Sequence, residues 1–393
     1  MKHCLRNSRE KLLTVFSMSV FGIFTYMTIG CAHSSSESSV VEIDCTKEIS
    51  NSELFDSLFN YNSYVILEDT ENSKISNIDK VYISDDKIVI LDNRTRILIF
   101  SQEGKFVKSI EHRGHGNGEY LSLNDFIVKG DSVYCLDRLE GKVLVYSLDG
   151  NYSYSKEVPS SKGFLFLNNG IALNKEFGMA NGRERDYYSY SYIEKNEVRN
   201  EIKYNKALNG RSFSTPSGSN GFYMSEENIY YCLPYSDTIY EINKETGNLS
   251  PVVRILLGDR VIQENDEEKK VLKIINSPVP SNIFAFYKWS NLFLFSYYGE
   301  NDIRQYVFYD SKKGLLHNAP LGFDKNHLPV SVMSYDNYRQ GKYRLLSCLS
   351  PTTVRFLYNK QNGQHVNPLL QELNSKIFNN DNPILIFYDI LHP

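Results

Sequence analysis

One repeat, in the first half of the chain, limits the fold more than any other feature. Residues 86–104 read DKIVILDNRTRILIFSQEG, and residues 131–150 read DSVYCLDRLEGKVLVYSLDG. Each copy has an apolar strand that ends in Leu-Asp, a polar turn, a second apolar strand and a turn that closes on glycine. The aspartates of the two copies, Asp92 and Asp137, lie 45 residues apart, which is the period of a β-propeller blade rather than of a helical solenoid. The sequence therefore predicts an all-β propeller.

Further strand signals follow along the chain, although the later copies are degenerate. Tyrosine and phenylalanine favour pleated, half-buried surfaces, and the chain has 29 Tyr and 22 Phe against one Trp. The expected strands beyond the two clear copies are Phe164–Leu167, Ile171–Leu173, Tyr187–Ile193, Asn228–Leu233, Thr238–Ile242, Ile283–Tyr287, Leu292–Tyr297, Gln305–Asp310, Tyr343–Leu349, Val354–Tyr358 and Ile384–Tyr388. Together these strands make about six blades.

Two departures from the strand pattern and one closing contact complete the prediction. Asp259–Ile275 and Val366–Asn374 carry apolar residues near helical spacing, so we expect short helical inserts there. A ring of blades keeps only short, protected edges when a strand from one terminus completes the blade made by the other. Tyr64–Leu67 and Ile384–Tyr388 are the candidates for that shared blade.

The first thirty residues form a targeting segment. A basic start is followed by the apolar run Leu12–Ile29, then by Gly30-Cys31 and a serine-rich spacer. This pattern resembles a bacterial lipoprotein signal, which implies cleavage before Cys31 and lipidation of its thiol. An uncleaved membrane anchor is the alternative, because the run is almost long enough to span a bilayer. We expect a signal peptide over 1–30, a flexible tether over 31–45 and the six-bladed propeller over 46–393.

Several segments of the chain together resemble one known family. They are KFVKSIEHRGHGNGEYLSLNDF, the repeated Leu-Asp strands, SDTIYEI and the ending DNPILIFYDI. The chain resembles the six-bladed β-propeller lipoproteins of Bacteroidota, distant relatives of NHL-repeat propellers. The resemblance covers most of residues 40–391, and residues 160–220 depart from it most. It implies the propeller fold and a lipid anchor at the cell envelope, in the outer membrane, but no particular chemistry.

The glycine-rich segment of that resemblance carries the main cluster of polar side chains, at His112, Arg113, His115, Glu119 and Tyr120. Histidines, an arginine and a carboxylate on a glycine-rich connection are suited to bind an anion or a divalent metal. The alternative is structural, because three glycines in five residues provide the positive φ angles of a tight loop between blades. We favour the structural interpretation and keep these five residues as candidate ligand contacts.

Other chemistry-bearing residues have plain structural interpretations. Asp92 and Asp137 recur at equal positions of two blades, which favours turn capping over a catalytic pair. The tyrosines of 187–190 and 297–298 offer flat rings to a sugar or peptide, but alternate tyrosines in strands mostly pack between blades. The cysteines of the mature chain lack metal-ligand spacing, and the two in apolar strands, Cys135 and Cys232, are expected to be buried. A disulfide among the four cysteines beyond Cys31 is left open.

Composition and motifs bound the function. The formal net charge is −4 and there is no basic stripe, so no nucleic-acid partner is expected. We find no HExxH, no GxSxG and no nucleophile–base pair, and assign no catalytic residue, metal or cofactor. We therefore expect a monomeric envelope lipoprotein that binds a glycan, peptide or partner protein at one mouth of the propeller channel. The alternative is a metal-assisted hydrolase or lyase that uses the channel.

Overall fold

The computed structural model divides into two units, Met1–Ser38 and Ser39–Pro393, and describes residues of the second only. The described residues are 40–46, 50–51, 59–84, 86–175, 188–208, 221–225, 227–277, 283–298, 304–319, 328, 332–333, 335–336, 344–360 and 367–390. The predicted signal peptide and Cys31 lie outside them. No helix among the described residues has the length and apolar character needed to cross a membrane.

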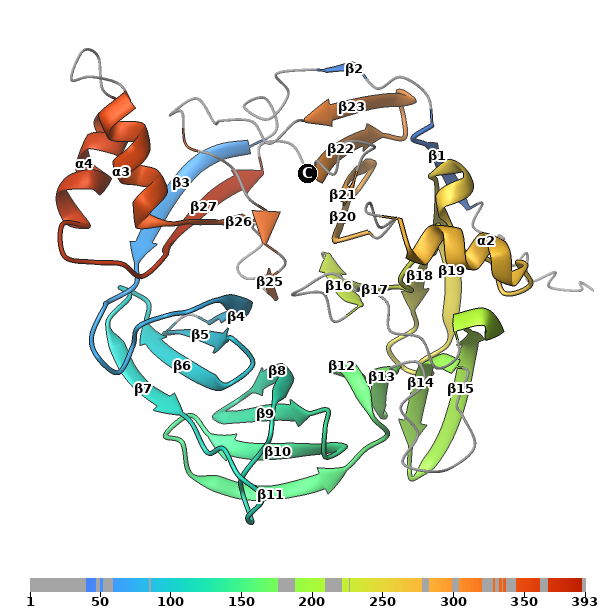
Figure 1. Cartoon of the computed structure of the whole chain (residues 1–393), viewed down its shortest axis with the longest axis horizontal. Coiled ribbons are helices and arrows are strands. Elements are labelled where there is room, and N and C mark those ends of the chain that lie inside the picture. Colours follow the sequence, from blue (N-terminus) through green and yellow to red (C-terminus); the bar gives the residue numbers. More distant parts are fainter. Residues whose placement is uncertain are drawn as a thin grey trace, which may run out of the picture. The chain divides into compact units, whose positions relative to one another are not determined.

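Six small sheets stand in a ring, which confirms the predicted six-bladed β-propeller (Figure 1). From the channel outward, the four main strands of blade 1 are β4 (Ile78–Ile83), β5 (Lys87–Asp92), β6 (Arg96–Ser101) and β7 (Phe106–Ile110), and the short β25 (Tyr335–Asp336), described below, lies on the channel side of β4. Blade 2 consists of β8 (Leu123–Lys129), β9 (Ser132–Asp137), β10 (Lys142–Ser147) and β11 (Tyr152–Glu157). Blade 3 consists of β12 (Ser161–Phe166), β13 (Ile171–Lys175), β14 (Tyr188–Glu194) and β15 (Glu197–Lys203).

The next two blades add a strand from the amino-terminal segment to their outer edges. Blade 4 consists of β16 (Phe222–Ser225), β17 (Asn228–Cys232), β18 (Thr238–Ile242) and β19 (Leu249–Leu256), and β1 (Val41–Asp44) lies parallel to β19. Blade 5 consists of β20 (Ala285–Trp289), β21 (Leu292–Tyr298), β22 (Arg304–Asp310) and β23 (Leu315–Ala319), and β2 (Ser50–Asn51) lies parallel to β23. β1 therefore lies in a sheet, within the stretch predicted as a tether over 31–45.

Blade 6 joins the two ends of the chain. It consists of β24 (Val332–Met333), β26 (Arg344–Leu349), β27 (Ile384–Ile390) and β3 (Phe59–Ile66), and β27 pairs antiparallel with β3. The closing contact predicted from the sequence is therefore confirmed. The neighbouring β25 (Tyr335–Asp336) pairs with β4 of blade 1.

A buried asparagine strengthens this closure. Asn382, which has no exposed surface, donates from Nδ2 to the carbonyls of Glu68 and Ser73, each at 2.8 Å. Its Oδ1 accepts from the Ile75 amide at 2.7 Å. One side chain near the carboxyl terminus thus satisfies three backbone groups of the connection that enters blade 1, and it fixes that connection against the last blade.

The helices confirm both predicted inserts and correct one predicted strand. The elements are η1 (Lys206–Leu208), η2 (Gly258–Arg260), α2 (Glu268–Ile275), α3 (Pro351–Lys360) and α4 (Pro368–Lys376). The strand expected over Val354–Tyr358 is wrong, because these residues lie in α3. The Ser350 hydroxyl accepts from the Thr353 amide at 3.1 Å, and Pro351 occupies the first turn, so the segment starts as a capped helix.

One buried carboxylate joins the inner strands of the first three blades, through an ion pair to blade 1 and a hydrogen bond to blade 3. Asp125 of β8, 1% exposed, accepts from Lys80 Nζ of β4 at 2.9 Å and from the Phe164 amide of β12 at 3.1 Å. Lys80 also donates to the Phe126 carbonyl at 2.9 Å. A buried charge persists only when it is paired and hydrogen-bonded, and this pair meets both conditions. It therefore fixes the relative positions of blades 1, 2 and 3 along the channel.

Candidate functional site

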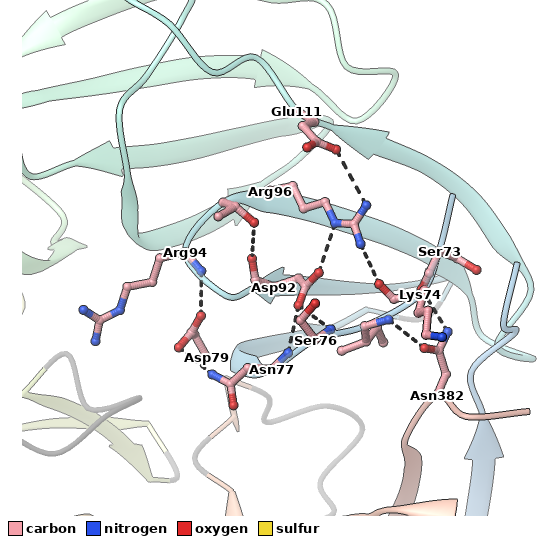
Figure 2. Close-up of polar contacts among 12 residues, drawn as sticks. Ser73, Lys74, Ser76, Asn77, Asp79, Asp92, Arg94, Arg96, Glu111 and Asn382 are labelled. Carbon is pink, nitrogen blue, oxygen red and sulfur yellow. Dashed lines mark hydrogen bonds and ion pairs between the residues drawn. The ribbon is translucent and has the colours of Figure 1, made fainter. Parts of the chain in front are cut away.

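The candidate site lies at one end of the blades, which we call the turn face. It carries the turns after the second strands (residues 92–96 and 137–142) and the connections that enter the inner strands (residues 67–78, 111–123 and 158–161). Two buried aspartates join these parts, as Figure 2 shows for Asp92. The turns between the third and fourth strands lie at the other end, because neighbouring strands run antiparallel.

Asp92 and Asp137 hold backbone amides. Asp92 Oδ1 accepts from the amides of Ser76 and Asn77 at 2.9 and 3.0 Å, and its Oδ2 accepts from Arg96 Nε at 3.0 Å. Asp137 Oδ2 accepts from the Leu121 amide at 2.7 Å. Its Oδ1 accepts from the amides of the following turn, those of residues 139 and 140, at 2.9 and 3.2 Å. Both carboxylates thus serve as acceptors for backbone amides, as the capping interpretation predicted.

Blade 3 places a lysine at the same position. Asp92, Asp137 and Lys175 end their second strands and pair with the first residues of the inner strands in the same register. Lys175 is 6% exposed, and this burial lowers the pKa of its ammonium group to about 8. Its carbonyl accepts from the Tyr204 hydroxyl at 3.2 Å. A charge of opposite sign therefore occupies an equivalent site one blade further on.

Three of the five candidate residues in the glycine-rich loop support that loop. Tyr120 is fully buried, and its hydroxyl donates to the Thr95 carbonyl at 2.8 Å and accepts from the His112 amide at 3.3 Å. The His112 ring stacks on Tyr146 with centroids 5.6 Å apart. Glu119 Oε2 accepts from the Gly116 amide at 2.7 Å. These three side chains fix the connection between blades 1 and 2.

The other two candidates of the loop face solvent. Arg113 is exposed, and His115 has 80% of its side chain exposed, with Nδ1 3.4 Å from Glu140 Oε1. Their contact with a ligand stays a prediction. Over the described part of the chain, no group of three or more His, Cys, Asp or Glu side chains is placed to hold a metal ion.

A groove on the turn face lies between blades 3 and 4, which the sequence did not indicate as a site. It has a volume of about 870 Å³ and is lined by Tyr188, Lys203, Tyr204, Asn205, Lys206, Ala207, Glu264, Asn265, Asp266 and Glu268. Tyr188 is half-buried, and Lys203 Nζ lies 5.8 Å from its ring centroid. The walls therefore combine an aromatic ring, lysines and carboxylates.

Hydrogen bonds hold the backbone beside this groove. Ile202 has a φ of 54°, which is a rare conformation for a β-branched residue, and its carbonyl accepts from the Ser189 hydroxyl at 3.1 Å. The two walls are joined by Asn205, whose Nδ2 donates to the carbonyls of Gln263 and Asp266 at 2.8 and 2.9 Å. The groove is thus a fixed feature of the face rather than a gap between separate loops.

The remaining tyrosines and cysteines pack in the core. Tyr190 is fully buried and donates to the Gly247 carbonyl at 2.8 Å, and Tyr297 is 5% exposed. These residues follow the packing interpretation, whereas Tyr188 lines the groove. The four cysteines within the described ranges, Cys45, Cys135, Cys232 and Cys348, are all free thiols. Cys135 and Cys232 are buried, as predicted.

Comparisons with known proteins place this fold among bacterial relatives. A family model described as "Domain of unknown function (DUF4934)" matches residues 38–389. The fold is similar to that of a candidate exported protein from Bacteroides fragilis, with a TM-score of 0.66 and 18% identity over 90% of this chain and 99% of that chain. A duf4221 family member from Bacteroides vulgatus gives a TM-score of 0.47 and 10% identity over 84% of this chain and 97% of that chain. A search of curated proteins finds no match.

Proposed function

Because the chain belongs to the DUF4934 family and folds into a six-bladed propeller, we propose that it is a lipid-anchored binding protein of the bacterial cell envelope. The predicted lipidation of Cys31, next to a short spacer, accounts for the anchor, and the outer membrane is the expected site. The propeller accounts for binding, since a rigid ring positions a ligand on one of its faces. The predicted relationship to NHL-repeat propellers stays a prediction.

The groove between blades 3 and 4 is the observation that carries the binding proposal. Its volume of about 870 Å³ lies in the range of small-molecule and cofactor sites. Lysines on one wall and carboxylates on the other suit a ligand with many hydroxyl or amide groups, while Tyr188 offers a ring for stacking. We infer that the groove holds a segment of a glycan or of an extended peptide.

A binding screen with a matched tyrosine control tests the groove. The full-length protein in detergent is screened against arrays of oligosaccharides and peptides, and the best binder is titrated. Tyr188→Ala should weaken its affinity at least about tenfold, because the stacking ring is lost. Tyr154→Ala is the control, since Tyr154 is 53% exposed on β11, away from the groove. Unchanged affinity in Tyr188→Ala would place the ligand elsewhere.

Membrane fractionation tests the anchor. Cys31→Ser removes the thiol that the lipid would modify, so the protein should appear in the soluble fraction or keep its signal segment. Gel mobility separates the processed form from the unprocessed form. Processed Cys31→Ser protein that stays in the membrane fraction would contradict the lipoprotein proposal.

A further inference from the structure

The mouth of the channel on the turn face has a repeated irregularity. The inner strands β4, β8 and β12 each carry one extra residue at the same register, namely Asp79, Asn124 and Lys162. Each bulge lies near the start of its strand, where the connection from the turn face enters. Bulges are common next to functional sites, because the extra residue changes the direction of a side chain. Three aligned bulges therefore give one rim of the channel a recurrent set of polar positions.

Arg94 lies beside the first of these bulges in a strained conformation. It has a φ of 55° and follows Asn93, which has a φ of 48°, in the tight turn between β5 and β6. Asparagine and glycine are the residues that adopt such angles readily, and arginine is not among them. The strain is held from both sides, because the Arg94 amide donates to Asp79 Oδ2 at 2.7 Å and its carbonyl accepts from the Leu123 amide at 2.9 Å.

The carboxylates near Arg94 accept hydrogen bonds from groups other than the Arg94 guanidinium. Asp79 accepts from the Arg94 amide and from Asn77 Nδ2 at 3.0 Å, and Asp92 accepts from Arg96. Figure 2 shows the Arg94 guanidinium extended away from this cluster. Among the ion pairs of the described residues, Arg96 is paired and Arg94 is not. An exposed guanidinium that makes no ion pair within the described ranges is thus held on a backbone conformation that a glycine would adopt without strain.

We propose that Arg94 binds an oxyanion of a ligand at the channel mouth, with Asn124 and Lys162 as the next contacts along the rim. A guanidinium presents paired donors that match the two oxygens of a carboxylate or phosphate group. The carboxylate of an acidic sugar and a phosphate group share this chemistry. This site is separate from the groove between blades 3 and 4. A failure of the function proposed for that groove would therefore leave the proposal for Arg94 unchanged.

The test variant is Arg94→Gly, which removes the charge and relieves the strain of the turn. Calorimetric titration at constant ionic strength uses sodium glucuronate, inorganic phosphate and, as the neutral control, glucose. The wild-type protein should bind at least one of the two anions, and Arg94→Gly should weaken that binding at least about tenfold. Its melting temperature should stay equal or rise, because glycine prefers the left-handed conformation.

Lys195→Gly is the matched control. Lys195 is also a basic residue with a positive φ, 47°. It lies in the tight turn between β14 and β15 of blade 3, at the end of the blades opposite to the turn face. Lys195→Gly should gain stability in the same way and keep anion binding unchanged. Preference for glucuronate indicates an acidic sugar or peptide, and preference for phosphate indicates a phosphorylated ligand. Absence of saturable binding to both anions, or equal binding by Arg94→Gly, would overturn the proposal.

Discussion

Blades 1 and 2 carry an aspartate at the end of the second strand, and blade 3 carries Lys175 at the same position. The backbone that leads into each inner strand explains this difference. Asp92 and Asp137 accept from the amides of Ser76 and Leu121, which lie two residues before the register partner of each aspartate. The equivalent residue of blade 3 is Pro159, which has no amide hydrogen. The aspartate is thus needed where the connection carries a donor, and blade 3 lacks that donor.

This comparison explains why a lysine is allowed in blade 3 and what its burial costs in stability. Because Pro159 offers no amide hydrogen at this place, the position does not require an aspartate for that contact, and Lys175 occupies it. Its carbonyl supports Tyr204 of the groove, so the change from Asp to Lys occurs beside the candidate binding surface. Burial of the ammonium group costs stability, which is a frequent property of positions near binding sites.

The largest expected effect is at Asp137. Asp137→Ala leaves the partly buried amides of Leu121, Leu139 and Glu140 without their acceptor, so we expect the free energy of unfolding to fall by about 2–4 kcal/mol. Urea unfolding followed by circular dichroism measures this change. The loss would show that the carboxylate, and not only the strand pattern, holds the connection between blades 1 and 2.

Asp149→Ala is the control for that prediction. Asp149 is exposed in the turn between β10 and β11, at the opposite end of the same blade. Its removal should change the free energy of unfolding by less than about 0.5 kcal/mol. A loss in Asp137→Ala as small as that in Asp149→Ala would mean that the amides bound by Asp137 find other acceptors, and the contrast between the blades would lose its explanation.

The sequence predicted the first two blades because their local chemistry repeats. Leu-Asp, a polar turn and a closing glycine recur with the same spacing, so the strands, the turns and the role of the aspartates could be inferred together. Blade 3 carries neither the aspartate nor the donor that it serves. The pair of Pro159 and Lys175 is therefore a signal only once the register of β12 and β13 is known.

Other features were harder to predict for different physical reasons. The apolar alternation of Val354–Tyr358 favours a strand, but the Ser-Pro signal at 350–351 starts a helix, and that signal was present in the sequence. The groove joins residues 203–208 to residues 264–268, and such long-range contacts have no local pattern. The strain at Arg94 follows from its place after Asn93 in the three-residue turn of residues 93–95, which became visible only with the pairing of β5 and β6.

The prediction with the smaller effect concerns Lys175, and it tests the other half of the comparison. Lys175→Met keeps the length of the side chain and removes a charge whose pKa is lowered to about 8 by burial. At pH 7 the wild-type protein carries the cost of a buried ammonium group in the folded state only. The variant should therefore be more stable at pH 7, by about 1–3 kcal/mol.

The pH dependence of this difference separates burial of charge from simple packing. Between about pH 8 and 10.5 the unfolded lysine keeps its proton while the folded one loses it, so this group makes the wild-type protein more stable as the pH rises. The advantage of Lys175→Met should shrink across that window in urea unfolding at pH 7, 8, 9 and 10. Lys273→Met, at an exposed position of α2, should show no such trend. A constant advantage at every pH would mean that folding leaves the pKa of Lys175 unchanged, and that the gain of the variant comes from packing rather than from removal of a buried charge.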